Sequence, residues 1–98
     1  MRFLVVGAGS WGTAFTRVLL ERGHDVVLGC RTRAQAEAIA ATGWNPHYLQ
    51  GVDLSAAEAV ALAEAPADVD VVVAAVPSQA FAEVVAGLPG EAPVLSLA

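Results

Sequence analysis

Residues 3–12 of the chain are Phe3-Leu4-Val5-Val6-Gly7-Ala8-Gly9-Ser10-Trp11-Gly12, a stretch that decides the fold. An uninterrupted apolar run is typical of a strand buried on both faces of a parallel sheet. The glycines that follow at once permit a tight turn from that strand into a helix. We therefore expect a strand at residues 3–6 and a helix at residues 10–22, ended by Gly23 in a left-handed conformation.

The glycines of this turn also predict a ligand. Gly7 permits the sharp turn, Gly9 lets a phosphate come close to the backbone, and Gly12 lets the helix pack tightly on the strand. The helix N-terminus offers N–H groups and a partial positive charge to phosphates. Because the G-x-G-x-x-G pattern lies between a strand and a helix, it indicates a dinucleotide site. A sharp turn without a ligand is the alternative.

Further strands and helices alternate along the rest of the chain. We expect strands at residues 26–28, 69–76 and 93–97, and helices at residues 33–41 and 78–86. Ser55 and Glu58 have the spacing of a capping box ahead of an alanine-rich stretch, which predicts a helix at residues 55–65. A short strand at residues 59–62 is the alternative. This alternation predicts an α/β fold, a doubly wound parallel-sheet Rossmann fold.

Size and composition limit the class of protein. The 98 residues suffice for one compact domain, and 56% hydrophobic against 15% charged residues excludes a disordered chain. A net charge of -5 without clustered basic residues argues against a nucleic-acid surface, and the apolar runs are too short to span a membrane. The single cysteine, Cys30, fits a reducing compartment, so we expect a cytoplasmic protein.

The residues after the second predicted strand bear on cofactor choice. An enzyme that uses NAD usually has Asp or Glu there, about 20 residues past the glycines, to bind the ribose hydroxyls. This chain has Gly29-Cys30-Arg31-Thr32-Arg33 instead, and Asp25 lies at the wrong end of the strand. Arg31 and Arg33 can clamp a 2′-phosphate, which favours NADP. Two solvated arginines beside a helix capped by Thr32 are the alternative.

Other residues near strand ends are weaker candidates. Pro77 and Ser78 follow the predicted strand at residues 69–76, where they should line the cofactor crevice unless they only start a helix. His47 has no Cys, Asp or Glu at ligand spacing, so we expect no metal site. Cys30 is interpreted as a small residue at a strand end whose exposure there could make it reactive.

Longer motifs resemble one family, the bacterial-type NAD(P)-dependent sn-glycerol-3-phosphate dehydrogenases. The resemblance covers most of the chain and rests on motifs that occur in order and at suitable spacing: Gly7-Ala8-Gly9-Ser10-Trp11-Gly12-Thr13-Ala14, Gly23-His24, Asn45-Pro46-His47-Tyr48-Leu49-Gln50-Gly51 and Ala75-Val76-Pro77-Ser78.

This resemblance implies an activity and several roles. The family interconverts dihydroxyacetone phosphate and sn-glycerol 3-phosphate by hydride transfer, which supplies the phospholipid backbone. Ser10 and Trp11 would contact the dinucleotide, Arg31 the 2′-phosphate, and Tyr48 would lie near the cofactor. A Trp11 side chain that fills a surface between domains is equally compatible with the sequence.

The resemblance also implies that the chemistry lies elsewhere. The family places one lysine just after the strand that matches residues 94–97, and a second in a later helical domain. This chain has no lysine, and its end is apolar. We therefore expect residues 1–98 to be the N-terminal part of a longer enzyme, truncated after about the fifth strand and inactive alone. The full-length protein would act on a small phosphorylated substrate. We expect it to form a homodimer and not to insert into a membrane. A related Rossmann reductase with another substrate, or a non-catalytic dinucleotide sensor, are the alternatives.

Overall fold

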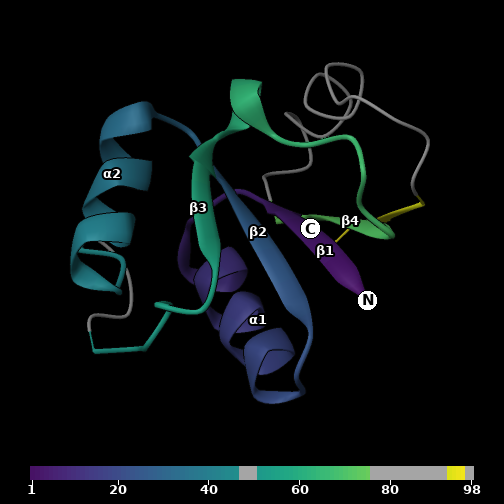
Figure 1. Ribbon diagram of the computed structural model, residues 1–98, viewed down its shortest axis with the longest axis horizontal. Coiled ribbons are helices and arrows are strands. Elements are labelled where there is room, and N and C mark those ends of the chain that lie inside the picture. Colours follow the sequence, from purple (N-terminus) through teal and green to yellow (C-terminus); the bar gives the residue numbers. More distant parts are fainter. Residues whose placement is uncertain (47–50, 76–92, 97–98) are drawn as a thin grey trace.

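The computed structural model describes residues 1–46, 51–75 and 93–96. Its elements follow one another in the order β1 (Arg2–Val6), α1 (Ser10–Glu21), β2 (Asp25–Cys30), α2 (Arg33–Thr42), β3 (Glu58–Ala61), a 3₁₀ helix (Leu62–Glu64), β4 (Val71–Ala74) and β5 (Val94–Ser96). Figure 1 shows the strands as one twisted sheet with α1 and α2 beside it. Among the described residues, no helix is both long and apolar enough to cross a membrane.

The strands form a parallel sheet in the order β3-β2-β1-β4-β5. Val5 of β1 lies opposite Leu28 of β2 on one side and Val73 of β4 on the other. The chain thus moves outward from β1 to β3 and then crosses back to continue through β4 and β5. This reversal beside β1 is the doubly wound order, which confirms the predicted fold class. The helix predicted at residues 78–86 lies outside the described residues.

The sheet buries side chains on both faces, as the continuous apolar strands predict. Val5, Leu28 and Val73 pack with Leu19 of α1 and Ile39 of α2, so both described helices cover the same face. The opposite face has a separate cluster of buried residues, which consists of Leu4, Val6, Val27 and Val72.

The described helices end as the sequence predicts. Beyond α1, the N–H of His24 donates to the carbonyl of Leu19 (3.1 Å) and the N–H of Gly23 to that of Leu20 (3.0 Å), with Gly23 at φ 79°. These paired bonds form a Schellman motif. Gly43 ends α2 in the same left-handed region, at φ 81°. The predicted boundaries of α1 and α2 are right to within one residue.

The prediction of a helix at residues 55–65 is wrong. Ser55 does not cap a helix, because both its N–H (2.9 Å) and its hydroxyl (2.6 Å) donate to Oδ1 of Asp53. These bonds, the hydroxyl first, lower the pKa of the Asp53 carboxyl. Residues Glu58–Ala61 form β3, which pairs with β2, so the alternative of a short strand is confirmed with a shift of one residue. Alanine favours a helix, but backbone groups along β2 need hydrogen-bond partners, and pairing between strands overrides this local propensity.

The strand β5 is more exposed than its sequence suggests. It lies at the outer edge of the described sheet, where Val94 and Leu95 are 37% and 50% exposed. The strand predicted at residues 93–97 is present over Val94–Ser96.

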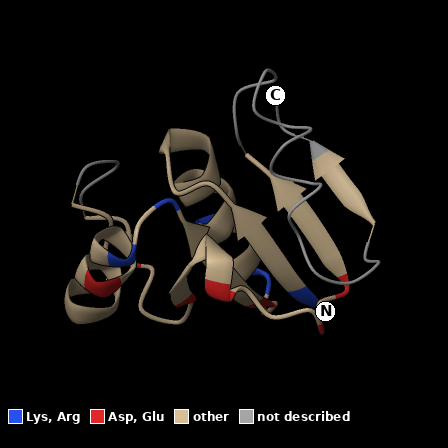
Figure 2. Ribbon diagram, turned by 90° about the horizontal axis from the view of Figure 1, so that it is seen from above, with Lys and Arg blue, Asp and Glu red and all other residues tan. Residues whose placement is uncertain are grey.

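Charged residues gather where the strands begin (Figure 2). Arg2 at the start of β1 forms ion pairs with Asp68 (2.8 Å), Glu58 (3.5 Å) and Asp25 (3.7 Å). Its backbone N–H also donates to Oδ2 of Asp70 at 2.8 Å. One arginine thus ties the amino ends of β1, β2, β3 and β4 together, and we call this group the Arg2 cluster.

Candidate functional site: the glycine turn at the carboxyl ends of the strands

The turn between β1 and α1 requires glycine at two positions because of its own backbone conformation and packing. Gly7 adopts φ 101°, which side chains rarely permit, and its N–H donates to the carbonyl of Gly29 at 2.9 Å. A Cβ at Gly12 would overlap the carbonyl oxygen of Gly7 and lie 3.4 Å from Cβ of Ala75. Gly7 and Gly12 therefore shape the turn and let α1 pack closely on the sheet, as predicted.

Gly9 differs from both of them. Its φ of -84° suits any residue, and a Cβ built there would meet nothing within 4 Å. Packing within the described chain therefore gives no reason for glycine at this position. The open space beside it is what a closely approaching ligand backbone would need.

The N-terminus of α1 is suited to an anion. Its N-cap residue is Gly9, which provides no side-chain acceptor, and the first turn carries no acidic residue. The start of α2 is different, since Thr32 Oγ1 accepts the N–H of Gln35 at 3.1 Å. The predicted capping role of Thr32 is thus confirmed. The first N–H groups of α1 have no such cap, and a phosphate would supply the missing acceptors.

Two amide side chains, one after the end of α2 and one in its first turn, brace the glycine turn. Asn45 is fully buried, and its Nδ2 donates to the carbonyl of Ala8 (2.6 Å) and to Oγ1 of Thr13 (3.3 Å). Nε2 of Gln35 donates to the same carbonyl at 3.2 Å. Asn45 belongs to one of the family motifs in the sequence, where it had no predicted role. Its contact with Ala8 has no local sequence signal, because 37 residues separate the partners.

Ser10 and Trp11 occupy the first turn of α1. Both are exposed, and Trp11 is 75% exposed although it is a large aromatic residue. An aromatic ring in that position can stack on a bound ligand or be covered by another part of a larger protein. The structure brings both residues next to Gly9, as the motif predicts.

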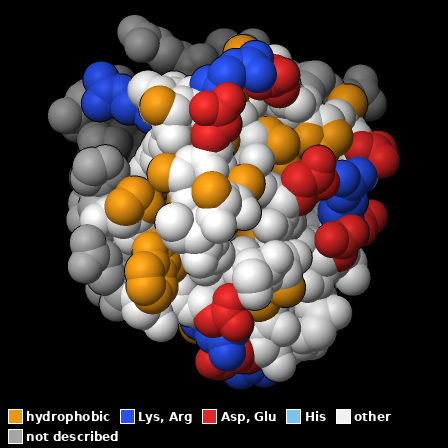
Figure 3. Space-filling model, turned by 60° about the vertical axis from the view of Figure 1, so that its left-hand side comes forward, with side chains coloured by type: hydrophobic (Ala, Val, Ile, Leu, Met, Phe, Trp, Pro, Cys, Tyr) orange, Lys and Arg blue, Asp and Glu red, His pale blue; other side chains and the backbone are white. Residues whose placement is uncertain are grey.

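The two arginines after β2 have different surroundings. Arg31 and Arg33 are both exposed. Nη2 of Arg33 pairs with Oε1 of Glu64 at 2.8 Å, whereas Arg31 makes no ion pair with any described residue. Basic side chains are scattered over the face seen in Figure 3, with acidic ones beside most of them. The carboxylate of Glu64 at this place could not be predicted from the motifs in the sequence.

Cys30 is a buried thiol. Its side chain is fully buried, and its Sγ lies 3.7 Å from the carbonyl of Leu28 as a hydrogen-bond donor. Burial raises the pKa of Cys30 to about 11. The interpretation of Cys30 as a small residue at a strand end is confirmed, and the exposure that could make it reactive is not found.

Four of the residues considered in the sequence, His47, Tyr48, Pro77 and Ser78, lie outside the described residues. In the described ranges, no group of His, Cys, Asp or Glu side chains could hold a metal ion.

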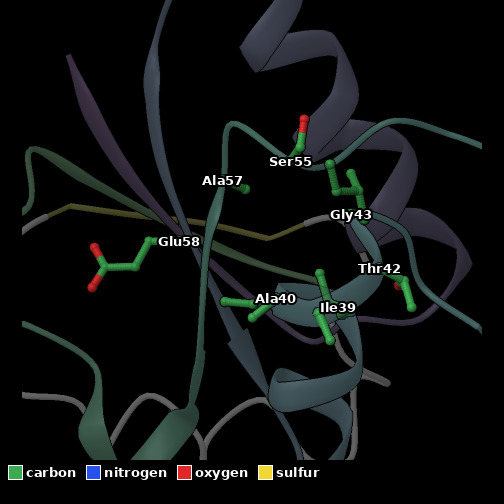
Figure 4. Close-up of a pocket in the computed structure, with 10 residues that line it drawn as sticks. Ile39, Ala40, Thr42, Gly43, Ser55, Ala57 and Glu58 are labelled. Atoms are coloured by element: carbon green, nitrogen blue, oxygen red, sulfur yellow. The ribbon is translucent and has the colours of Figure 1, made fainter.

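A groove of about 420 Å³ lies away from the glycine turn, between the end of α2 and the segment that leads into β3. Ile39, Thr42, Gly43 and Ser55 lie on its walls (Figure 4). Glu58 is its one ionisable lining residue, and it is paired with Arg2. The groove contains none of the predicted site residues, so the glycine turn is the better candidate site.

Comparison with known proteins shows the family of the chain. Residues 3–94 match the family model described as "NAD-dependent glycerol-3-phosphate dehydrogenase N-terminus". The chain belongs to this family. The resemblance found in the sequence motifs is therefore confirmed.

Individual members of the family are similar in sequence and structure. Glycerol-3-phosphate dehydrogenase [NAD(P)+] of Nocardia farcinica is 46% identical over 98 residues, which cover 99% of this chain and 28% of that protein. The crystal structure of glycerol-3-phosphate dehydrogenase from Coxiella burnetii matches 97% of this chain and 31% of its own, with a TM-score of 0.83 and 28% identity. The chain thus spans less than a third of the length of these relatives.

A further solved structure is similar to this chain in fold. It is 2-dehydropantoate 2-reductase from Methylococcus capsulatus, with a TM-score of 0.69 and 20% identity, over 98% of this chain and 33% of that one. Its likeness shows the fold alone, and it carries no information about substrate.

Proposed function

We propose that residues 1–98 form the N-terminal dinucleotide-binding domain of an NAD(P)-dependent sn-glycerol-3-phosphate dehydrogenase. The observation that carries this proposal is the uncapped N-terminus of α1 beside the open position at Gly9, in a chain of this family. The full-length enzyme would interconvert sn-glycerol 3-phosphate and dihydroxyacetone phosphate. A bound nicotinamide would supply or accept the hydride, and the residues of this chain would hold and orient the dinucleotide.

Separate parts of the turn have separate roles in this proposal. Gly7 and Gly12 set the shape, while the backbone at Gly9 and Ser10 receives the pyrophosphate. Trp11 would lie against the dinucleotide through its exposed ring. We also assign Tyr48 and Pro77 to the cofactor site, on the strength of the family motifs in the sequence.

Arg31 and Arg33 favour NADP over NAD in this proposal. A guanidinium can form paired hydrogen bonds with a 2′-phosphate. Arg31 is the better candidate, because it is exposed and pairs with no described carboxylate.

Reaction chemistry needs groups that this chain does not contain. Removing a proton from the substrate alcohol as hydride leaves requires a positioned base and charge stabilisation. The chain has no lysine and spans less than a third of the length of its relatives, so in this proposal the full-length enzyme supplies the lysine expected just after the strand at residues 94–97 and the second lysine expected in a later helical domain. We further propose a cytoplasmic homodimer, and we expect this fragment alone to bind dinucleotide without turnover.

The proposal is tested with the purified full-length protein. Oxidation of sn-glycerol 3-phosphate, followed by the absorbance of the reduced nicotinamide, should require NADP or NAD. Binding of either dinucleotide without any such turnover would instead favour the non-catalytic sensor. Turnover of another hydroxy acid alone would favour the related reductase.

Cofactor choice has its own experiment. Titration with NADPH and NADH should show tighter binding of NADPH, and Arg31→Ala should remove most of that preference while leaving NADH binding in place. Equal affinity for both dinucleotides, unchanged by Arg31→Ala, would contradict the assignment.

A further inference from the structure

The end of β3 supplies a carboxylate at a place where the sequence of β2 has none. Cys30 at the end of β2 lies opposite Ala61 at the end of β3, so the two strands stop side by side. The residues that follow them therefore meet at the same edge of the sheet. Glu64, the last residue of the 3₁₀ helix after β3, pairs there with Arg33 at 2.8 Å.

This ion pair is close to the glycine turn. Arg33 is the first residue of α2, and Gln35 in the same helical turn donates to the carbonyl of Ala8 between Gly7 and Gly9. The start of α2 is thereby in direct contact with the turn that would hold the pyrophosphate. In a sheet of this order, the ribose of a bound dinucleotide lies at the end of β2.

The pair is also exposed to solvent and can rearrange. The side chains of Arg33 and Glu64 are 67% and 50% exposed. An exposed ion pair of this kind is weak, so a ligand can exchange with it. A 2′-phosphate that bound Arg33 would have to displace Glu64 and would lie near its negative charge. A ribose 2′-hydroxyl avoids this cost, since it can donate a hydrogen bond to a carboxylate.

We propose that Glu64 is a specificity-determining residue that partly neutralises Arg33 and so reduces the preference for 2′-phosphorylated dinucleotides. The inference rests on the proposed dinucleotide-binding function. Arg31 then provides the main attraction for the 2′-phosphate, and the pair of Arg33 with Glu64 keeps the site open to both dinucleotides.

The test compares neutral variants of two carboxylates in the full-length enzyme, at one fixed low ionic strength. Glu64→Gln should tighten NADPH binding about two- to fivefold and leave NADH binding the same or weaker. Glu58→Gln is the matched control, because Glu58 also lies in the β3 segment and pairs with an arginine, but among the strand starts. It should change neither affinity. Unchanged NADPH binding by Glu64→Gln, or an equal gain from Glu58→Gln, overturns the inference.

A second variant tests whether Glu64 acts through Arg33. Arg33→Ala should weaken NADPH binding more in the Glu64→Gln background than in the wild type, because only there is Arg33 unpaired. The same loss in both backgrounds would overturn the proposed coupling. A wild-type enzyme that binds neither NADPH nor NADH would contradict the proposed function itself, so the two failures are distinguishable.

Discussion

The side-chain amide of Asn45 donates a 2.6 Å hydrogen bond to the carbonyl oxygen of Ala8. This bond is buried and connects the loop after α2 with the middle of the glycine turn. The amide of Asn45 also donates to Oγ1 of Thr13 in α1. One side chain therefore links the glycine turn to the helix that follows it. The shape of the candidate site therefore depends on a residue that lies outside the glycine motif.

Asn45→Asp should weaken this brace with little change in side-chain size. The carboxylate cannot donate to the Ala8 carbonyl, which costs about 1–3 kcal/mol for a buried group left without its partner. We expect a lower free energy of unfolding in urea and a KM for the dinucleotide that rises more than kcat falls. Gln35→Glu is the milder control, because Gln35 is only partly buried. Native stability and an unchanged KM in Asn45→Asp would contradict the role of this bond.

Alanine substitutions should distinguish Gly9, which we expect to contact a ligand, from Gly12, which is needed for packing. Gly9→Ala places its methyl in open space at a permitted φ, so stability should stay within about 0.5 kcal/mol while dinucleotide affinity falls at least tenfold. Gly12→Ala forces a clash with the Gly7 carbonyl, so both stability and affinity should fall. The measurements are thermal unfolding and titration with NADPH. Full affinity in Gly9→Ala would argue against a phosphate at this position.

The buried Cys30 predicts a loss of stability in alkaline solution. Its folded pKa of about 11 exceeds the ordinary value of 9.0, so the unfolded state loses its proton first as pH rises. The stabilisation is complete below pH 9 and disappears towards pH 11, with a total of about 2 to 3 kcal/mol. Denaturant unfolding across this range should show the loss, and Cys30→Ala should show a smaller one. If the free energy of unfolding fell equally with pH in the wild type and in Cys30→Ala, the raised pKa of Cys30 would be disproved.

The Arg2 cluster predicts a stability that depends on salt. Arg2→Gln leaves Asp25, Glu58 and Asp68 facing one another without a cation, which should cost about 1–2 kcal/mol at low ionic strength. Added salt should reduce this difference between the variant and the wild type, because it screens the repulsion. Thermal unfolding at several salt concentrations provides the measurement. A difference that is independent of salt would point to lost packing of the Arg2 side chain instead.

The structural features that could be predicted from the sequence are those that depend on residues close together in the chain. The apolar strand before Gly7 and the helix ends at Gly23 and Gly43 depend on nearby residues, and all agree with the structure. The segment at residues 55–65 was assigned wrongly for the opposite reason. Its conformation depends on pairing with β2, a contact that helix propensity and capping spacing do not report.

Some residues of the candidate site could likewise be predicted from the sequence, and others could not. The glycines of the turn follow from their spacing, and Arg31 follows from its place after a strand. The contributions of Asn45 and Glu64 depend on contacts between elements that are distant in sequence. The carboxylate that pairs with Arg33 comes from the segment after β3, because the parallel strands β2 and β3 end at one edge of the sheet. Only the three-dimensional arrangement reveals such a pair.

The Arg2 cluster and the glycine turn lie at opposite ends of the strands, which has a consequence for protein engineering. Substitutions that strengthen or weaken the charged group around Arg2 share no contacts with Arg31, Arg33 or Glu64 among the described residues. Effects of distant, independent sites add. Thermal tolerance can therefore be selected at one end of the sheet while coenzyme preference is altered at the other, with neither trait limiting the other.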